Sequence, residues 1–382
     1  MAHKRIKLGI FFTHDENWIG GSYYILNLLS SLSLLPDEQQ PAVTVVCWTP
    51  QDFQHAVKTG YRYLQPLYPH QQLPFHQRII NKLLKPVSRK PVFNKASVPS
   101  TAFRAVFPCD HSGRFDKIKT KIYWIPDMQE IHLPGFFSKE ELEKRDRYRK
   151  SIASSSSVVV FSSHPAISDF KRILPSHICK TFEINFAVTH PPYNQLPIQS
   201  LKEKFSISRP WFFVPNQFWK HKDHPTVFRA IKNLNNHSVE FVFTGKENDS
   251  RSPGYFSELK QMINDWGISD RVKFLGFIDR AEQLQLMNHA IAVIQPSLFE
   301  GWSTVVEDSK AMNQWVLASD MDVHRQQLPG HPFFFPCGND EQLTLLLRKF
   351  ITGMPTRPEY QYEEKRKEFG RSFMKMLNDE LS

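Results

Sequence analysis

Short apolar runs alternate with amphipathic stretches along almost the whole chain, and this alternation restricts the possible fold more than any other feature. The runs lie at 6–12, 42–48, 104–107, 121–125, 157–161, 211–215, 239–244, 271–275, 290–294 and 315–319. Each has the length of a buried strand. Predicted helices fill most intervals, such as the mixed-charge segment Lys139–Ser151 and the segment near Tyr255–Trp266. Because strands and helices alternate, we predict an α/β fold with parallel, doubly wound sheets.

A proline-rich segment divides this pattern in two. Thr189–Pro197 reads as a linker within a less regular stretch, Ala187–Pro210, and the alternation restarts after it. A chain of 382 residues has room for two domains of ordinary size. We therefore expect Rossmann-like domains over 1–195 and 196–358. A charged helix over 359–382 closes the chain and is able to pack back on the first domain.

Basic residues are concentrated in one region of a chain whose formal net charge is +10. Between His76 and Lys121 there are eleven Lys or Arg and only two acids. Within this region Gln72–Val92 has the pattern of a basic amphipathic helix that ends near Pro86. It is either a face for an anionic membrane or a helix packed on its own domain with solvated charges. No aromatic–basic recognition motif accompanies the excess, so we expect no nucleic-acid partner.

Cysteine usage and hydropathy exclude several classes of protein. The four cysteines lie far apart without a CxxC pair, and no cluster has metal-ligand spacing, so we expect no metal and no cofactor. The apolar run near the N-terminus, Leu8–Phe12, is too short for a signal peptide. No run approaches the roughly 18 apolar residues of a membrane span. We expect a cytoplasmic protein, with peripheral binding to the inner membrane face as an option.

One stretch, Gln295–Met312, combines a strand end, an acidic loop and a helix start. The apolar run stops at Pro296, Glu300 and Gly301 follow, and Thr304-x-x-Glu307 has the spacing of a capping box. The N-terminus of a helix presents free amides that suit a phosphate. Nearby carboxylates suit hydroxyl groups. The stretch therefore predicts a site for a ligand that carries both, such as a sugar nucleotide.

Polar loops also follow other predicted strands. His14 and the pair Gly20–Gly21 come after the first strand, although the segment is not GxGxxG and is alternatively a mere tight turn. Asp127 follows the strand at 121–125, and Asn216–Lys222 follows the one at 211–215. In open parallel sheets ligands bind at the carboxyl ends of strands. We expect these loops to line one cleft between the two domains.

At Glu300 and Asp308 the chain resembles the retaining, family 4 glycosyltransferases of the GT-B fold, which carry Glu-x7-Glu between a strand and a helix. Here the second position is Asp. The run EGWSTVVED at 300–308 is similar to a branch that reads EGWSTVVEEAK. Three more stretches are similar to that branch: 215–224, 124–129 together with 132–134, and Ser319–Gln327. The resemblance covers nearly the whole chain and implies a GT-B fold.

The resemblance also implies roles for the donor side of the cleft. Glu300 would contact the transferred sugar, and Asp308 would take the ribose hydroxyls. Lys222 would bind the diphosphate; Gln217 stands where the family usually has an arginine, and Lys220 would compensate. The loop at Gly276–Ile278 would frame the base. The backbone from Ser303 through Thr304 to Val305 would meet the diphosphate, while Glu307 is expected to cap its own helix.

On the acceptor side, the resemblance places Gly20, Gly21 and His14 near the phosphates and acceptor, and Asp127 beside the acceptor. The first domain would bind the acceptor and the second the nucleotide sugar. Taken without the resemblance, Asp308 is an ordinary first-turn acid and Lys222 a solvated charge. We assign Glu300 and Asp127 as the catalytic candidates.

The function that follows is a metal-independent, hexosyltransferase-type retaining enzyme. It would move a sugar from a UDP- or GDP-sugar to a glycan or glycolipid acceptor in cell-surface polysaccharide biosynthesis. One alternative is an epimerase or a phosphorylase on the same fold. Another is a degenerate, non-catalytic protein that binds a nucleotide sugar.

Overall fold

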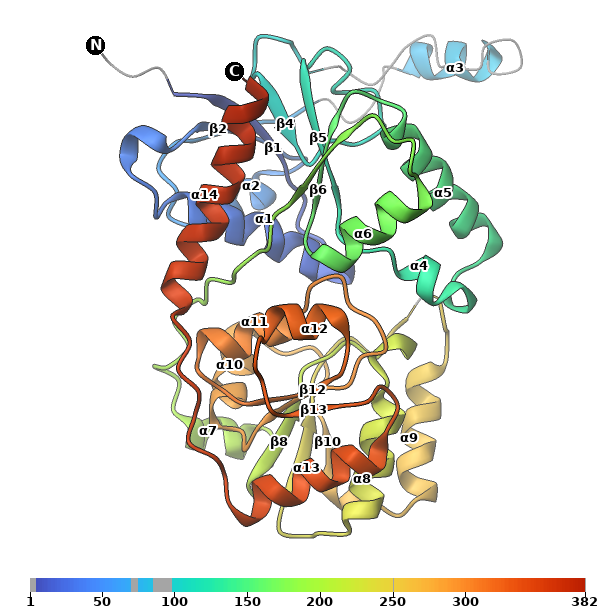
Figure 1. Cartoon of the computed structure of the whole chain (residues 1–382), viewed down its shortest axis with the longest axis vertical. Coiled ribbons are helices and arrows are strands. Elements are labelled where there is room, and N and C mark those ends of the chain that lie inside the picture. The colour runs from blue at the N-terminus through green and yellow to red at the C-terminus, as the bar shows by residue number, and fades with distance from the viewer. Residues whose placement is uncertain (1–4, 70–74, 85–97, 250, 382) are drawn as a thin grey trace.

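The computed structural model describes residues 5–69, 75–84, 98–249 and 251–381, and it contains two separate parallel sheets. Their strand orders are β3-β2-β1-β4-β5-β6-β7 and β10-β9-β8-β11-β12-β13. Every strand pair is parallel. Figure 1 shows the two sheets one above the other, each with helices around it. We call the first sheet with its helices the N-terminal lobe and the second the C-terminal lobe.

The N-terminal lobe is built from seven strands and the helices between them. Its strands are β1 Lys7–Phe11, β2 Ala42–Val46, β3 Leu64–Leu67, β4 Ala105–Phe107, β5 Thr120–Ile125, β6 Val158–Phe161 and β7 Lys180–Glu183. Its helices are α1 Ile19–Leu32, α2 Pro50–Val57, α3 Phe75–Leu84, α4 Gln129–His132, α5 Lys139–Ala153 and α6 His164–Ile173.

The C-terminal lobe repeats this plan with six strands. Its strands are β8 Trp211–Val214, β9 Glu240–Phe243, β10 Val272–Phe274, β11 Val293–Gln295, β12 Val316–Ser319 and β13 Phe334–Phe335. Its helices are α7 Ile198–Lys204, α8 His224–Leu234, α9 Tyr255–Asp265, α10 Arg280–His289, α11 Thr304–Ala311, α12 Asp322–Gln327 and α13 Asp340–Thr352. The last helix, α14, spans Tyr362–Leu381.

Central strands are apolar on both faces because helices cover both faces of each sheet. Strand β6 reads VVVF, β8 reads WFFV and β9 reads EFVF, and every residue in these three strands is buried. Two apolar cores form in each lobe. Continuous apolar runs of this kind are typical of parallel sheets. The structure therefore confirms the predicted α/β, doubly wound architecture.

The chain crosses between the lobes twice, and α14 ends against the N-terminal lobe. This helix packs on α1, and its residues Phe369 and Phe373 join the same core as Tyr24. A Cβ atom on Gly370 would lie only 2.7 Å from the Ser31 carbonyl oxygen, so glycine permits the close approach of the two helices. Figure 1 shows α14 beside the first sheet, far from the second.

Several short elements were not predicted from the sequence. Strand β3 contains Pro66, which breaks a strand pattern, and β13 has only two residues. Helix α7 lies inside the irregular stretch 187–210, where its seven residues bury a single side chain, Leu201. Elements this short have too few residues to display a period, and their position depends on the neighbours they pair with.

Candidate functional site

A cavity of about 230 Å³ lies between the two lobes, where the carboxyl ends of their strands meet. It brings together most of the predicted site residues: Gly20, Gly21, Asp127, Gln217, Lys222, Glu300, Ser303, Thr304 and Val305. The first three belong to the N-terminal lobe and the others to the C-terminal lobe. Residues remote in sequence thus line a single cleft.

Glu300 makes the densest set of contacts in this cleft. Its Oε1 atom accepts hydrogen bonds from Lys222 Nζ at 2.5 Å, Gln295 Nε2 at 2.7 Å and Ser297 Oγ at 2.6 Å. Gln295 is the last residue of β11, and Ser297 follows Pro296. The end of the strand and the first residues of the loop therefore fix the position of the Glu300 carboxylate. Among the described residues none donates to Oε2, which leaves that oxygen open to a ligand.

Lys222 keeps Glu300 ionised although the carboxyl group is only 10 % exposed. Burial alone would raise the pKa of Glu300. The adjacent Lys222 ammonium and the Ser297 hydroxyl outweigh burial, and the pKa lies below its ordinary value. A largely buried, ionised carboxylate therefore faces the cleft beside the Lys222 side chain.

The start of α11 supplies backbone donors beside this pair. Ser303, not Thr304, is the N-cap, because its Oγ atom accepts from the Val306 N–H at 3.3 Å. The Ser303 N–H itself donates to Gln327 Oε1 at 2.9 Å. Of the residues that the structure describes, none accepts from the N–H groups of Thr304 and Val305. These two N–H groups therefore remain available as hydrogen-bond donors at the cleft.

The prediction that Glu307 caps its own helix is wrong. Glu307 is buried, and its Oε1 atom accepts from Lys310 Nζ at 2.9 Å and from Gln327 Nε2 at 2.9 Å. Its Oε2 atom accepts from the Tyr362 hydroxyl at 2.6 Å. The Glu307 carboxylate thus accepts three hydrogen bonds, whereas a capping box would give it one, from the backbone N–H of the N-cap residue.

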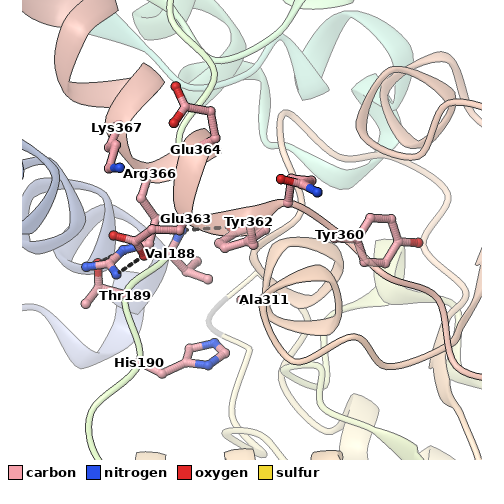
Figure 2. A pocket seen from close by; sticks show the side chains of 11 residues that line it. Val188, Thr189, His190, Ala311, Tyr360, Tyr362, Glu363, Glu364, Arg366 and Lys367 are labelled. Atoms are coloured by element: carbon pink, nitrogen blue, oxygen red, sulfur yellow. Dashed lines mark hydrogen bonds and ion pairs between the residues drawn. The ribbon is translucent and has the colours of Figure 1, made fainter.

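Tyr362 links this buried carboxylate to the place where the chain crosses between the lobes. The Val188 N–H donates to the Tyr362 hydroxyl at 2.9 Å, and Figure 2 shows the two crossing segments side by side there. A cavity of about 720 Å³ opens beside them. It is larger than the cleft but contains none of the predicted site residues, so we do not place the chemistry in it.

Asp308 lies behind the cleft, in a second charged cluster. Its Oδ1 atom accepts from His190 Nε2 at 2.9 Å and from Arg280. Burial acts to raise the pKa of Asp308, but Arg280 and His190 together hold it below its ordinary value. Arg280 was not identified from the sequence, since nothing in its own segment distinguishes it from a surface arginine at the start of α10.

The partners of Asp308 line another cavity of about 730 Å³, which adjoins the cleft at Ile19. His14 lines it too, and the His14 ring stacks on His55 with centroids 4.1 Å apart. His14 was predicted to lie with Gly20 and Gly21, but it lines this second cavity together with Arg280, whereas the two glycines line the cleft. Ile19 lines both cavities.

The remaining predicted residues occupy different surroundings. Asp127 lines the cleft, where its Oδ1 atom accepts from the Gln129 N–H at 3.1 Å. Lys220 and Gly276 are absent from the linings of the two adjoining cavities. Lys220 Nζ instead lies 5.7 Å from the centre of the Tyr255 ring. Gly276 has a φ of +69°, a conformation that favours glycine, and its carbonyl accepts from Gly245.

The loops of the two lobes touch directly at Gly301. A Cβ atom there would lie 2.2 Å from the Pro126 carbonyl oxygen, so only glycine permits this contact. The neighbouring Trp302 donates from Nε1 to the Phe186 carbonyl at 3.0 Å. The acidic loop is thus held by both lobes.

Neither a metal cluster nor a membrane span is found among the residues that the structure describes. No group of three His, Cys, Asp or Glu side chains in this part of the chain is placed to hold a metal ion. Nor does any helix in it have the length and apolar character needed to cross a membrane.

Residues 199–369 match the family Glycosyl transferases group 1. The matched residues form the C-terminal part of the chain and are somewhat less than half of its length. The match confirms the family predicted from the Glu300-x7-Asp308 loop. The O-antigen chain mannosyltransferase RfbU of Salmonella typhimurium is 25% identical over 154 residues, which are 40% of this chain and 41% of that protein. The match therefore spans less than half of that relative.

Solved structures of glycosyltransferases share the whole fold. Anabaena Alr3699/HepE in complex with UDP and glucose has a TM-score of 0.65 and 14% identity, with 98% of each chain covered. Sucrose-phosphate synthase from Thermosynechococcus elongatus has a TM-score of 0.63 and 14% identity, with 98% of this chain and 94% of that chain covered. WaaG, a glycosyltransferase involved in lipopolysaccharide biosynthesis, has a TM-score of 0.56 and 14% identity, with 99% and 100% covered. The fold is GT-B.

Proposed function

We propose that this protein is a metal-independent, retaining glycosyltransferase that transfers a hexose from a nucleotide sugar to a glycan or glycolipid. The observation that carries the proposal is the Lys222–Glu300 ion pair beside the open amides of Thr304 and Val305. An ammonium group and a helix N-terminus suit a diphosphate, whereas a carboxylate suits sugar hydroxyls. The cleft thus offers both recognition chemistries that a nucleotide sugar requires.

The same groups account for the departure of the nucleoside diphosphate. Negative charge develops on the leaving phosphate as the bond to the sugar breaks. Lys222 and the amides of α11 are in place before the reaction and stabilise that charge without reorganisation. Glu300 holds the sugar through Oε2 while Lys222 and Ser297 fix Oε1. Asp127 faces the cleft from the N-terminal lobe, on the side assigned to the acceptor.

The comparisons support UDP as the first donor nucleotide to test, with GDP as the second. The solved HepE structures contain UDP and UDP-glucose. An O-antigen mannosyltransferase and a lipopolysaccharide glycosyltransferase are among the similar proteins. We therefore propose a surface glycan or its lipid-linked precursor as acceptor, and the cytoplasmic face of the membrane as the place of reaction.

Helix α3 supports a peripheral membrane contact. It extends from the body of the N-terminal lobe in Figure 1, and its apolar side chains Phe75 and Leu83 are 76 % and 70 % exposed. Ile79 and Lys82 are exposed on the same helix. An apolar face accompanied by basic residues suits an anionic bilayer surface. The rest of the predicted segment 72–92 lies outside the described residues.

A thermal-shift panel tests donor binding. UDP, GDP, ADP and dTDP, each with and without a sugar, are compared, because a ligand that binds the folded state raises the melting temperature. The Glu300→Ala variant should then lose transfer by at least about 100-fold. It should still fold, since the residue lies in a loop, but its melting temperature should be lower because Lys222, Gln295 and Ser297 lose their shared acceptor. A wild-type protein that responds to none of the nucleotides would contradict the proposal.

A binding protein without transferase activity is the second candidate, and Gln217 favours it. This uncharged amide lines the cleft at the position where the resembling family usually has an arginine. Binding of a nucleoside diphosphate with no turnover of any nucleotide sugar would support this reading. Conversion of the donor without an acceptor would instead indicate an epimerase, and dependence on inorganic phosphate a phosphorylase.

A further inference from the structure

Helix α12 ends in two adjacent glutamines, Gln326 and Gln327, that bond to different lobes. They close the stretch Ser319–Gln327, to which the proposed chemistry assigns no role. The helix lies between α6 of the N-terminal lobe and α11 of the C-terminal lobe and contacts both. It is therefore placed to affect the start of α11 without entering the cleft.

Gln327 clamps the residue that begins α11. Its Oε1 atom accepts from the Ser303 N–H at 2.9 Å, while its Nε2 atom donates to the Ser303 carbonyl at 3.1 Å. The same Nε2 atom donates to Glu307 Oε1 at 2.9 Å. One side-chain amide thus fixes both backbone groups of the N-cap residue and a carboxylate one turn further along the helix.

This clamp determines which backbone donors a ligand meets. The Ser303 N–H is occupied by Gln327 and the Val306 N–H by the Ser303 hydroxyl. The next two amides, those of Thr304 and Val305, remain open beside the cleft. Gln327 is only 2 % exposed and is not among the residues that line the cavity. It has no direct access to a ligand and can act only through the backbone of α11.

Gln326 bonds in the opposite direction. Its Nε2 atom donates to Glu183 Oε1 at 2.5 Å, and its Oε1 atom accepts from the His164 N–H at 2.9 Å. Both partners belong to the N-terminal lobe. Gln326 therefore provides a matched comparison, since it has the same side chain on the same helix without a bond to α11.

We propose that Gln327 is a positioning residue for the donor diphosphate: it holds the N-cap of α11 so that the amides of Thr304 and Val305 point at the phosphates. The inference rests on the proposed function, because it requires that a nucleoside diphosphate binds at this helix. It predicts that Gln327 contributes to recognition of the phosphates and contributes nothing to recognition of the nucleoside.

The test compares nucleoside diphosphate with nucleoside by calorimetry. UDP, GDP, ADP and dTDP are first measured on the wild-type protein, and the tightest binder is used together with its own nucleoside. Gln327→Leu keeps the size of the side chain and removes its three hydrogen bonds. We expect diphosphate affinity to fall roughly tenfold and nucleoside affinity to stay unchanged. Gln326→Leu should leave diphosphate affinity within about twofold of wild type.

Each outcome bears on a separate claim. If wild type binds none of the four diphosphates, the proposed function fails whatever the variants do. If wild type binds but Gln327→Leu weakens diphosphate and nucleoside equally, or no more than Gln326→Leu does, Gln327 has only a structural role and the inference is wrong. Should Gln327→Leu not fold, Gln327→Asn, whose amide is too short to reach Ser303, gives the same comparison.

Discussion

At the scale of single residues, the cleft depends on a charged pair whose members lie 78 positions apart in sequence. The sequence predicts each of them as a ligand contact on its own segment, and the structure shows that they also bond to each other. Lys222 offsets the burial of Glu300, and Glu300 offsets the burial of Lys222. An ammonium group has three N–H donors, so Lys222 can bind a donor phosphate while it keeps its bond to Glu300.

Replacing Lys222 with methionine should change both binding and pH dependence. Nucleoside diphosphate affinity should fall on the order of 10- to 100-fold, the loss expected for a charge-assisted hydrogen bond. Burial is then opposed only by the Ser297 hydroxyl and by His324, so the pKa of Glu300 rises. The acid limb of kcat/KM should consequently move to higher pH.

Lys220→Met is the control for this substitution, because Lys220 lies near Tyr255 and has no hydrogen bond or ion pair with Glu300 among the described residues.

In the wild type, the depressed pKa of Glu300 means that the pair stabilises the fold above pH 4.5, and that this stability is lost as pH falls through the lower, folded-state pKa. An acid limb that does not move in Lys222→Met would contradict the assigned role of the pair.

At the scale of elements, the acidic loop before α11 requires glycine for reasons of space. Gly301→Ala should open the cleft, because its Cβ atom would lie 2.2 Å from the Pro126 carbonyl oxygen and the two loops must move apart. Transfer should fall at least tenfold, while each lobe keeps its own core. Small-angle scattering should show a larger radius of gyration.

Gly135→Ala is the matched control, since a Cβ atom there meets nothing within 4 Å. It should leave both activity and dimensions as in the wild type. Normal transfer by Gly301→Ala would show that the lobes do not need this contact during the reaction.

Helix α3 supports a second prediction at this scale. Phe75 and Leu83 are largely exposed, and replacing both with Glu removes apolar surface and adds negative charge. Binding to vesicles that contain anionic lipid should fall at least tenfold, and wild-type binding should weaken as salt rises. Wild-type binding that ignores both lipid charge and salt would indicate a helix without a membrane role.

At the scale of the whole molecule, the fold buries His224 in surroundings that disfavour its protonated form. His224 is fully buried; burial, with Lys222 nearby, lowers its pKa to about 3. In the unfolded chain a histidine titrates near pH 6.5. Because the unfolded state then binds the extra proton, the contribution of His224 is present above pH 6.5 and is lost as pH falls towards 3.

The free energy of unfolding should therefore drop by about 2 kcal/mol between pH 6.5 and pH 5 through this residue alone. Urea unfolding at a series of pH values measures the slope. His224→Phe keeps the ring contact with Phe218, which is 4.7 Å away in the wild type, and removes the titrating group. Its curve should be flatter over this interval; parallel curves for variant and wild type would refute the prediction.

Local patterns in the sequence were sufficient for much of this architecture. Alternating apolar runs and helical spacing depend on residues within a few positions of one another, so they identified the parallel sheets, the acidic loop at Glu300 and the start of α11 at Thr304. Short elements such as β13 escaped because two residues cannot show a period. Their existence depends on a neighbouring strand, here β12.

Only the tertiary structure decided which partner each buried polar group takes. Glu307 has the spacing of a helix cap, yet it bonds to Tyr362, 55 positions away. Asp308 pairs with His190 and Arg280 from two other segments, and Gln327 reaches back 24 positions to Ser303. Burying a charge or an amide costs free energy unless hydrogen bonds or an opposite charge compensate for the lost water. Which groups from remote segments lie close enough to provide them is decided by the tertiary fold.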